Sequence, residues 1–181
     1  MKIKIIALVG ETGAGKDTFA AIVKENFSSV LLLRFSESLT AVLKIFFDEV
    51  KKEDQQWLVN LLRDRFGEDI LMKAVAKKIE RAKEEIVIVN GIRVIEEFNF
   101  IKNLGGTIVY VTLDAKERWE RVRIRKEKKD DDVSYEKFLE IDNRRPEKQI
   151  GEIGKKADIK IENTGNLEEL KMKAIEIINN L

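Results

Sequence analysis

Near the start of the chain lies Gly10-Glu11-Thr12-Gly13-Ala14-Gly15-Lys16-Asp17-Thr18, which has the spacing G-x-x-x-x-G-K. An apolar run at residues 3–9 precedes this stretch, and a run with helical periodicity at residues 18–27 follows it. A strand, a glycine-rich loop and a helix in this order are typical of a phosphate-binding loop, or P-loop. The order therefore predicts that residues 10–18 bind a polyphosphate anion through backbone N–H groups at the amino end of a helix.

The residue types within the loop fit this interpretation. Glycines at positions 10, 13 and 15 allow a tight turn and a close approach of the backbone to an anion. Lys16 supplies a mobile positive charge for a phosphoryl group that is being transferred. The alternative is a glycine-rich turn with a surface lysine, which would not account for the strand and the helix on either side.

Position 17 departs from the usual P-loop pattern, in which Ser or Thr follows the lysine and binds Mg²⁺ through its hydroxyl. Here Asp17 stands in that place and Thr18 follows it. A carboxylate can ligate Mg²⁺ directly or through water, because hard cations prefer oxygen ligands. An acidic residue in the first turn of a helix is also favoured by the helix dipole alone. Both interpretations stay open, and we expect Asp17 and Thr18 to help hold Mg²⁺.

Length and charge restrict the class of protein. A chain of 181 residues suits one domain with a real core. With 34 basic and 33 acidic residues, it lacks the excess of positive charge that nucleic-acid binding uses. No apolar run approaches the length of a membrane span, and the first residues resemble a strand rather than a signal peptide. We therefore expect a cytoplasmic protein without a nucleic-acid or membrane partner.

The absence of Cys and His restricts the chemistry. Without them there is no disulfide, no thiol nucleophile and no imidazole base or metal ligand. Catalysis must rely on Lys, Arg, Asp, Glu and a metal ion. Phosphoryl transfer is one reaction that needs little else.

Short apolar segments alternate with amphipathic ones along the whole chain. The predicted strands are residues 3–9, 29–35, 86–89, 107–113 and 157–162. The predicted helices are residues 18–27, 38–50, 54–66, 70–82, 96–104, 114–126, 134–144 and 167–181, with Pro146 ending the seventh. This order predicts an α/β fold, a three-layer α/β/α sandwich around a five-stranded, mostly parallel sheet. We identify it with the P-loop NTP hydrolase fold, with a helical lid, in a single domain spanning residues 1–181.

Residues that follow the predicted strands are candidates for the site, because ligands bind beyond the carboxyl ends of parallel strands. After the second strand come Arg34 and Ser36, which we expect on the substrate side. Ser36 could instead cap the next helix. After the third strand come Asn90 and Arg93. Arg93 could bind the acceptor through its guanidinium, or form a surface ion pair with a nearby glutamate.

The turn after the last strand is the fourth candidate. It contains Asn163 and Gly165, which we expect beside the base of the nucleotide. A plain turn would use the same residue types, so this alternative stays open.

Basic residues gather in two further segments. Arg118, Arg121 and Arg125 share one face of their predicted helix, and their charge could be neutralised by phosphates or by nearby acidic residues. They belong to the expected lid region, residues 118–150, in which Arg144 could close on the same charge. Arg65 lies in residues 36–84, the expected helical insertion for the acceptor, and could grip the acceptor's phosphate.

These segments together resemble the P-loop small-molecule kinases of the nucleoside monophosphate kinase and dephospho-CoA kinase group. The likeness is closest to archaeal adenylate-kinase-related and dephospho-CoA-kinase-like proteins, and it spans essentially the whole chain. It rests on residues 10–18, on the strand and turn at 86–97, on the arginines of the lid helix and on residues 157–170. The group usually carries Asp where this chain has Asn90, and an amide neither takes up a proton as a base nor offers full charge to Mg²⁺.

The resemblance implies a kinase that uses ATP and Mg²⁺ and phosphorylates a nucleotide or a nucleotide-like small molecule. A (deoxy)nucleoside monophosphate is the first expectation for the acceptor, and dephospho-CoA is the alternative. Lys16, Arg121 and Arg125 are the expected catalytic residues. An ATP-binding regulatory module without transferase activity is the alternative from another class. The oligomeric state does not follow from the sequence.

Overall fold

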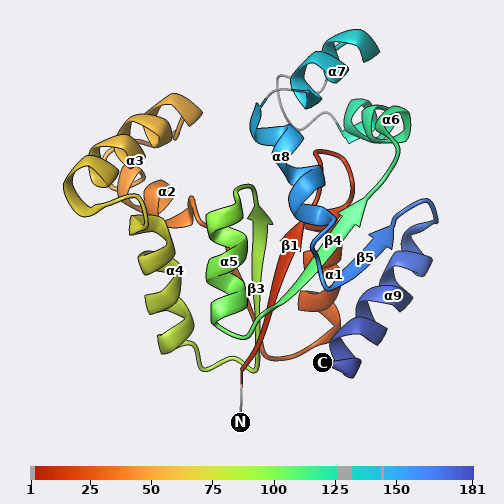
Figure 1. Cartoon of the computed structure of the whole chain (residues 1–181), viewed down its shortest axis with the longest axis horizontal. Coiled ribbons are helices and arrows are strands. Elements are labelled where there is room, and N and C mark those ends of the chain that lie inside the picture. Colours follow the sequence, from red (N-terminus) through yellow and green to blue (C-terminus); the bar gives the residue numbers. More distant parts are fainter. Residues whose placement is uncertain (1–2, 126–131, 144) are drawn as a thin grey trace.

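The computed structural model of the chain describes residues 3–125, 132–143 and 145–181, and of residues 145–148 it describes the backbone alone. Within these residues, five strands form one sheet in the order β2-β3-β1-β4-β5. The strands are β1 Lys4–Val9, β2 Val30–Leu33, β3 Ile86–Ile92, β4 Thr107–Thr112 and β5 Ile159–Glu162. Each neighbouring pair is parallel, so the predicted sheet is confirmed and is parallel throughout (Figure 1).

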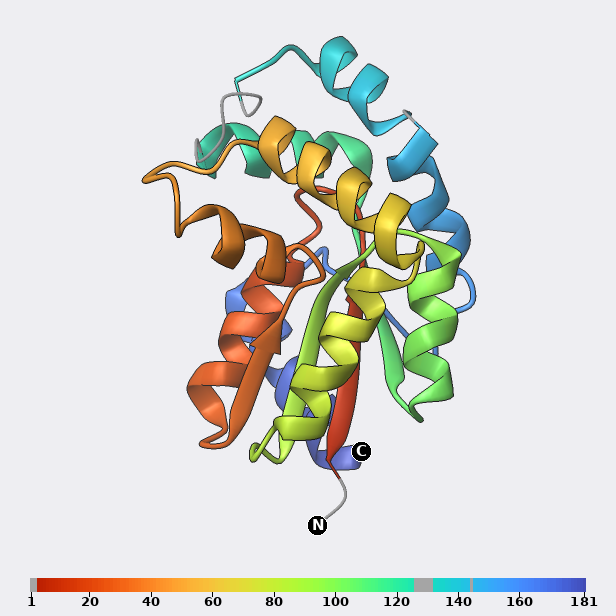
Figure 2. The same cartoon turned by 90° about the vertical axis from the view of Figure 1, so that its left-hand side faces the viewer.

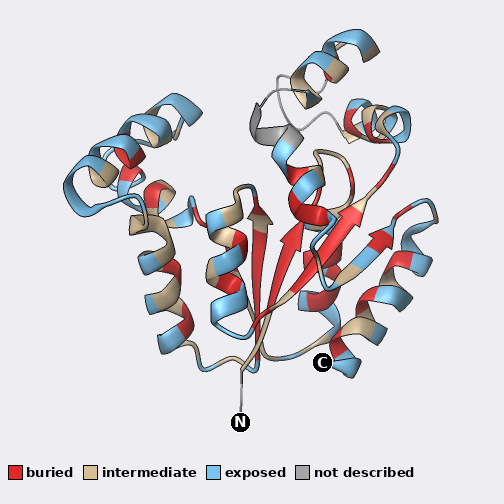
Figure 3. Ribbon diagram, viewed as in Figure 1, coloured by how far each residue is buried: buried red, intermediate tan, exposed pale blue. Residues whose placement is uncertain are grey.

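Helices cover both faces of the sheet and produce the predicted three layers. On one face lie α1 (Lys16–Asn26) and α9 (Leu167–Asn180), and on the other α4 (Ile70–Arg81), α5 (Ile95–Asn103) and α8 (Arg145–Gly154). In the central strand β1, Ile6 and Leu8 point into the first layer and Ala7 and Val9 into the second. All four are fully buried, which explains the apolar run at residues 5–9 of this strand (Figure 3).

The remaining helices stand at the carboxyl ends of the strands. They are α2 (Glu37–Leu43) and α3 (Lys52–Phe66), and α6 (Ala115–Arg125) and α7 (Tyr135–Asp142). The α3 helix lies across that end of the sheet (gold in Figure 2). The α6–α7 pair stands at the same end, above β4 and on the side away from α3 in Figure 1. In the part of the chain that the structure describes, no helix is both long and apolar enough to cross a membrane.

The helix predicted for residues 38–50 is shorter than expected. It ends at Leu43, whose carbonyl oxygen accepts from the backbone N–H groups of both Phe46 and Phe47, at 3.0 Å each. These bonds tighten the chain into a turn. Phe46 and Phe47 are consequently 73% and 54% exposed, and they do not extend the buried face of the helix.

The role predicted for Pro146 was wrong. The α7 helix ends at Asp142, and a further helix that the sequence did not predict, α8, begins at Arg145 and contains Pro146 in its first turn. Proline is tolerated there because the missing N–H would have no partner within the helix. The α8 helix then contributes Ile150 and Ile153 to the core.

Candidate functional site

The loop between β1 and α1 depends on a glycine directly before the helix. Gly15, the residue before α1, has a φ of 106°. A Cβ atom at Gly15 would lie 2.4 Å from Nδ2 of Asn163, so glycine is needed here for space as well as for backbone conformation. Asn163 is 4% exposed, and its Nδ2 donates to the carbonyl oxygen of Ala14 at 2.9 Å. The turn after β5 therefore braces the loop directly.

The Lys16 side chain turns back to the loop, where its Nζ donates to the carbonyl oxygen of Glu11 at 2.9 Å. The Glu11 carboxylate in turn accepts from the hydroxyl of Tyr110 on β4. Burial and this hydrogen bond raise the pKa of Tyr110 to about 12, so the hydroxyl remains a donor at neutral pH. The interaction ties the loop to the central sheet.

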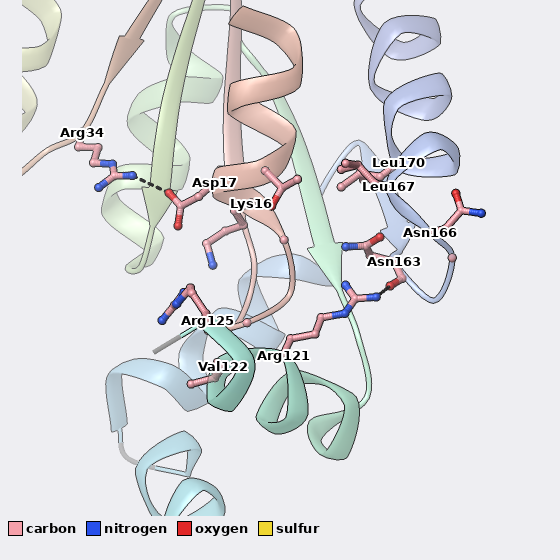
Figure 4. A pocket seen from close by; sticks show the side chains of 14 residues that line it. Lys16, Asp17, Arg34, Arg121, Val122, Arg125, Asn163, Asn166, Leu167 and Leu170 are labelled. Atoms are coloured by element: carbon pink, nitrogen blue, oxygen red, sulfur yellow. Dashed lines mark hydrogen bonds and ion pairs between the residues drawn. The ribbon is translucent and has the colours of Figure 1, made fainter. Parts of the chain in front are cut away.

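A cavity of about 640 Å³, called here the loop cavity, opens beside these residues. Its cationic side carries Lys16, Arg121 and Arg125, and Leu167 and Leu170 of α9 form an apolar side (Figure 4). A cavity with one cationic and one apolar side suits a ligand that carries phosphates at one end and a flat ring at the other.

Arg121 and Arg125 of α6 meet the turn after β5 at this cavity. Nη2 of Arg121 donates to the carbonyl oxygen of Asn163 at 2.8 Å. Asn163 and Gly165, which the sequence predicts beside the base of a nucleotide, also line the cavity, and so does Thr18. Arg118 lines neither this cavity nor the next one described, and it is only 4% exposed. The three arginines therefore do not act as one exposed face.

A second cavity of about 540 Å³, called here the insertion cavity, lies between the loop and the expected insertion at residues 36–84. Arg34, Ser36, Asn90 and Arg93, predicted on the substrate side, line it. Ser36 is the residue before α2, but its hydroxyl does not cap that helix. The loop and insertion cavities share Lys16, Asp17, Arg34 and Arg125, so ligands in the two would meet at these residues.

The α3 helix contributes Lys52, Gln55 and Arg63 to the insertion cavity. Arg65, the residue of this segment that the sequence predicts for the acceptor, is exposed and lines none of the cavities described. Two residues along a helix correspond to a rotation of about 200°, so Arg63 and Arg65 point in nearly opposite directions. The polar stripe at Lys52, Gln55, Gln56 and Arg63 has helical spacing and is the signal that could have identified this face.

Asp17 lies at the junction of the strand ends. Its Oδ1 accepts from Nη2 of Arg34 at 2.5 Å and from Nδ2 of Asn90 at 2.7 Å. Asp17, Arg34 and Asn90 also line a third cavity of about 600 Å³ between α1 and β2. Asn90 is 8% exposed, and its Oδ1 is buried without a hydrogen-bond partner among the described residues. An unpartnered buried acceptor at a cavity wall favours a ligand that donates to it.

The described residues hold no group of three or more Asp, Glu, His or Cys side chains that could enclose a metal ion. A divalent ion here would have Asp17 as its protein carboxylate and would take its other ligands from phosphate oxygens and water. This donor set fits Mg²⁺, which usually binds through one or two carboxylates together with substrate phosphates. Thr18, the other predicted ligand, lines the loop cavity but not the insertion cavity.

A glutamate that sequence analysis did not select lies at the back of the insertion cavity. Oε2 of Glu97 accepts from the backbone N–H of Arg93 at 2.9 Å. Burial raises the pKa of Glu97, while hydrogen bonds from the backbone at Arg93 and Val94 and the charges of Arg93 and Arg63 act against the rise. The carboxyl group therefore takes up a proton more readily than an exposed glutamate. Arg144, predicted for the lid, lies outside the described residues, as do residues 126–131 of the expected lid region.

The chain is similar to proteins of a known family over most of its length. Residues 6–148 match the AAA domain family. Over 182 residues, the chain is 31% identical to a UPF0200 protein of Sulfurisphaera tokodaii, and the alignment covers 99% of this chain and 98% of the relative. The likeness therefore extends beyond the loop to the insertion and to the closing helix.

Solved structures with the same fold include TT1252 from Thermus thermophilus, with a TM-score of 0.63 and 22% identity over 100% of this chain and 99% of that one. They also include shikimate kinase from Bacteroides thetaiotaomicron, with a TM-score of 0.63 and 16% identity over 97% and 98% of the two chains. Likeness at these identities establishes the P-loop α/β/α fold and nothing about the acceptor.

Proposed function

The chain belongs to the AAA domain family and to the UPF0200 family, and we propose that it is an ATP-dependent kinase for a nucleotide or a nucleotide-like small molecule. The observation that carries the proposal is the sharing of Lys16, Asp17, Arg34 and Arg125 by the loop and insertion cavities. A kinase needs a donor site and an acceptor site that meet where the phosphoryl group passes between them.

ATP would bind in the loop cavity. Backbone N–H groups of residues 10–16 and the Lys16 ammonium group would hold the phosphates, and Leu167 and Leu170 would contact the base. Asp17, with Thr18 nearby, would hold Mg²⁺, which neutralises phosphate charge when it is bound.

The acceptor would bind in the insertion cavity, where Arg34, Lys52, Arg63 and Arg93 supply positive charge. This lining supports an acceptor that carries an anionic group, and a (deoxy)nucleoside monophosphate is the first candidate. Dephospho-CoA remains the alternative within the same reaction class. Because two basic residues come from α3, residues 36–84 would act as the acceptor-binding insertion.

In the transfer, an oxygen of the acceptor attacks the γ-phosphorus in line with the bond to ADP. The new P–O bond forms as the bond to the β-phosphate oxygen breaks, and the acceptor's proton leaves to solvent or to a phosphate oxygen. Lys16, Arg121 and Arg125 would stabilise the charge that develops on the transferring group. The Asp17 carboxylate, held by Arg34 and Asn90, would keep its position at the junction of the two sites.

A turnover assay tests the proposal. The protein is incubated with Mg²⁺ and ATP together with nucleoside monophosphates, dephospho-CoA or related phosphates, and ADP and the phosphorylated product are measured. We expect Lys16→Ala to lose about 10³-fold or more in kcat while remaining folded, because it removes charge stabilisation at the transferring group. Lys173→Ala, an exposed position on α9, is the matched control and should retain the activity.

ATP binding without transfer to any acceptor would instead support a regulatory module. Asn90 is the observation that favours this second function, because its amide takes the place of a carboxylate. An active Lys16→Ala enzyme would contradict the role given to that residue.

A further inference from the structure

Arg118 is the most buried charged side chain among the described residues. It is 4% exposed, and its guanidinium group has partners in three segments of the chain. Nε donates to the carbonyl oxygen of Leu113 at 3.0 Å, and Nη1 to that of Thr12 at 3.3 Å. Nη1 and Nη2 donate to the two carboxylate oxygens of Asp142 at 2.8 and 2.7 Å. One side chain therefore joins the P-loop, the end of β4 and α7.

Asp142, the ion-pair partner of Arg118, is partly buried as well. Asp142 lies in the last turn of α7, with a side chain that is 18% exposed. The ring of Phe138, one turn earlier, lies under the guanidinium group with its centroid 5.5 Å from Cζ. A planar guanidinium can make all four of these hydrogen bonds at once, whereas a lysine ammonium group has only three N–H donors.

The P-loop packs closely against the helix that carries Arg118. Gly13 has a φ of 86°, and a Cβ atom there would lie 2.8 Å from the carbonyl oxygen of Arg118 and 2.9 Å from Cγ2 of Val122. The tip of the loop thus rests on the α6 backbone, with no room for a side chain. From the same helix, Arg121 and Arg125 reach the loop cavity.

We propose that Arg118 and Asp142 are positioning residues, which hold the P-loop, α6 and α7 as one unit so that Arg121 and Arg125 stand over the bound triphosphate. Neither residue lines the loop cavity or the insertion cavity, so both act through other residues. The inference rests on the proposed nucleotide site, because it concerns the affinity of that site. It does not depend on which acceptor is used.

The test separates positioning from stability by means of a double variant. Arg118→Met and Asp142→Leu each break the pair and leave a buried group without its partner, so each should lower the melting temperature. The double variant R118M/D142L replaces the pair with apolar side chains and should recover much of that stability, because buried ion pairs can be replaced in this way. It still lacks the donor to Thr12, so we expect its ATP affinity, measured by calorimetry, to stay at least tenfold below wild type.

Asp142→Asn is the second variant, which keeps the shape of the side chain and removes its charge. It should raise KM for ATP about tenfold and KM for the acceptor less, because Arg121 lines the loop cavity alone whereas Arg125 lines both cavities. Lys137→Met, on the exposed face of the same helix, is the control and should change neither affinity nor stability. ATP affinity equal to wild type in R118M/D142L or in D142N would overturn the inference.

Failure of the inference can be told apart from failure of the proposed function. If the wild-type protein binds ATP but transfers phosphate to no acceptor, kinase activity is refuted and the affinity test still decides the role of Arg118 and Asp142. If the wild-type protein does not bind ATP, both proposals are refuted.

Discussion

Single residues decide whether the P-loop can form. Gly15 and Asn163 come from opposite ends of the chain, yet Nδ2 of Asn163 occupies the space that a side chain at position 15 would need. Asn163 also donates to the carbonyl oxygen of Ala14. The conformation of the loop therefore depends on glycine at position 15 and on the buried side-chain amide of Asn163.

We predict opposite effects for alanine at two glycines. Gly15→Ala should lower the free energy of unfolding by more than the ~1–2 kcal/mol cost of a left-handed alanine, because it also clashes with Asn163. ATP affinity should fall with it. Gly151→Ala lies within α8, where nothing approaches the new methyl group within 4 Å, and should stabilise the protein by ~0.5–1 kcal/mol. Urea unfolding measures both, and a neutral Gly15→Ala would contradict the close approach.

A pH prediction concerns Glu97. Burial raises its folded-state pKa above the unfolded value of about 4.5. The stability associated with the protonated form is therefore fully present below pH 4.5 and is lost as pH rises through the folded-state pKa. Glu97→Gln stays neutral, so its stability relative to wild type should increase as pH rises from about 4.5 through the folded-state pKa and then level off. Melting curves at several pH values test this, and a difference that does not vary with pH would refute it.

At the scale of elements, the direction of each helix decides which of its side chains reach the site. The α3 helix turns Lys52, Gln55 and Arg63 toward the insertion cavity and leaves Arg65 in solvent. The short α2 helix does not continue to Phe46 and Phe47, because the chain turns after Leu43. The sequence predicted that these helices exist and where α3 ends, but it misjudged the end of α2 and the side of α3 that faces the cavity.

The two arginines of α3 form a matched pair for a prediction. Arg63→Ala should raise KM for the acceptor about tenfold or more without changing KM for ATP, because it removes a charge from the insertion cavity alone. Arg65→Ala should change neither constant. Steady-state kinetics with each substrate varied in turn would check this. An equal effect of the two variants would contradict the orientation of α3.

At the scale of the whole molecule, the parallel sheet brings its strand ends to one edge and the helical segments close around that edge. Asp17 in the first turn of α1 accepts from Arg34, directly after β2, and from Asn90 of β3, three residues that lie far apart in the sequence. On the other side, α6 and the turn after β5 meet through Arg121 and Asn163. The donor and acceptor sites of the proposed reaction are therefore both products of the tertiary fold.

A ligand that binds this edge should stabilise the entire domain. At a concentration of about 100 times Kd, ATP with Mg²⁺ should contribute ~2.7 kcal/mol. For a chain of this length, that corresponds to a rise in melting temperature of about 5–10 °C. Removing Mg²⁺ with a chelator should reduce the rise, and Lys16→Ala should nearly abolish it. A wild-type melting temperature that does not change when ATP is added would refute the nucleotide site.

The sequence by itself determined the P-loop, the alternation of strands and helices and hence the three-layer fold. These depend on local signals: the glycine spacing at residues 10–15 and the period of the apolar residues. Only the tertiary structure decided which side chains serve the site. Arg118 is buried because it meets Thr12, 106 residues away, and Asp142, 24 residues away, and helical periodicity carries no information about such distant partners.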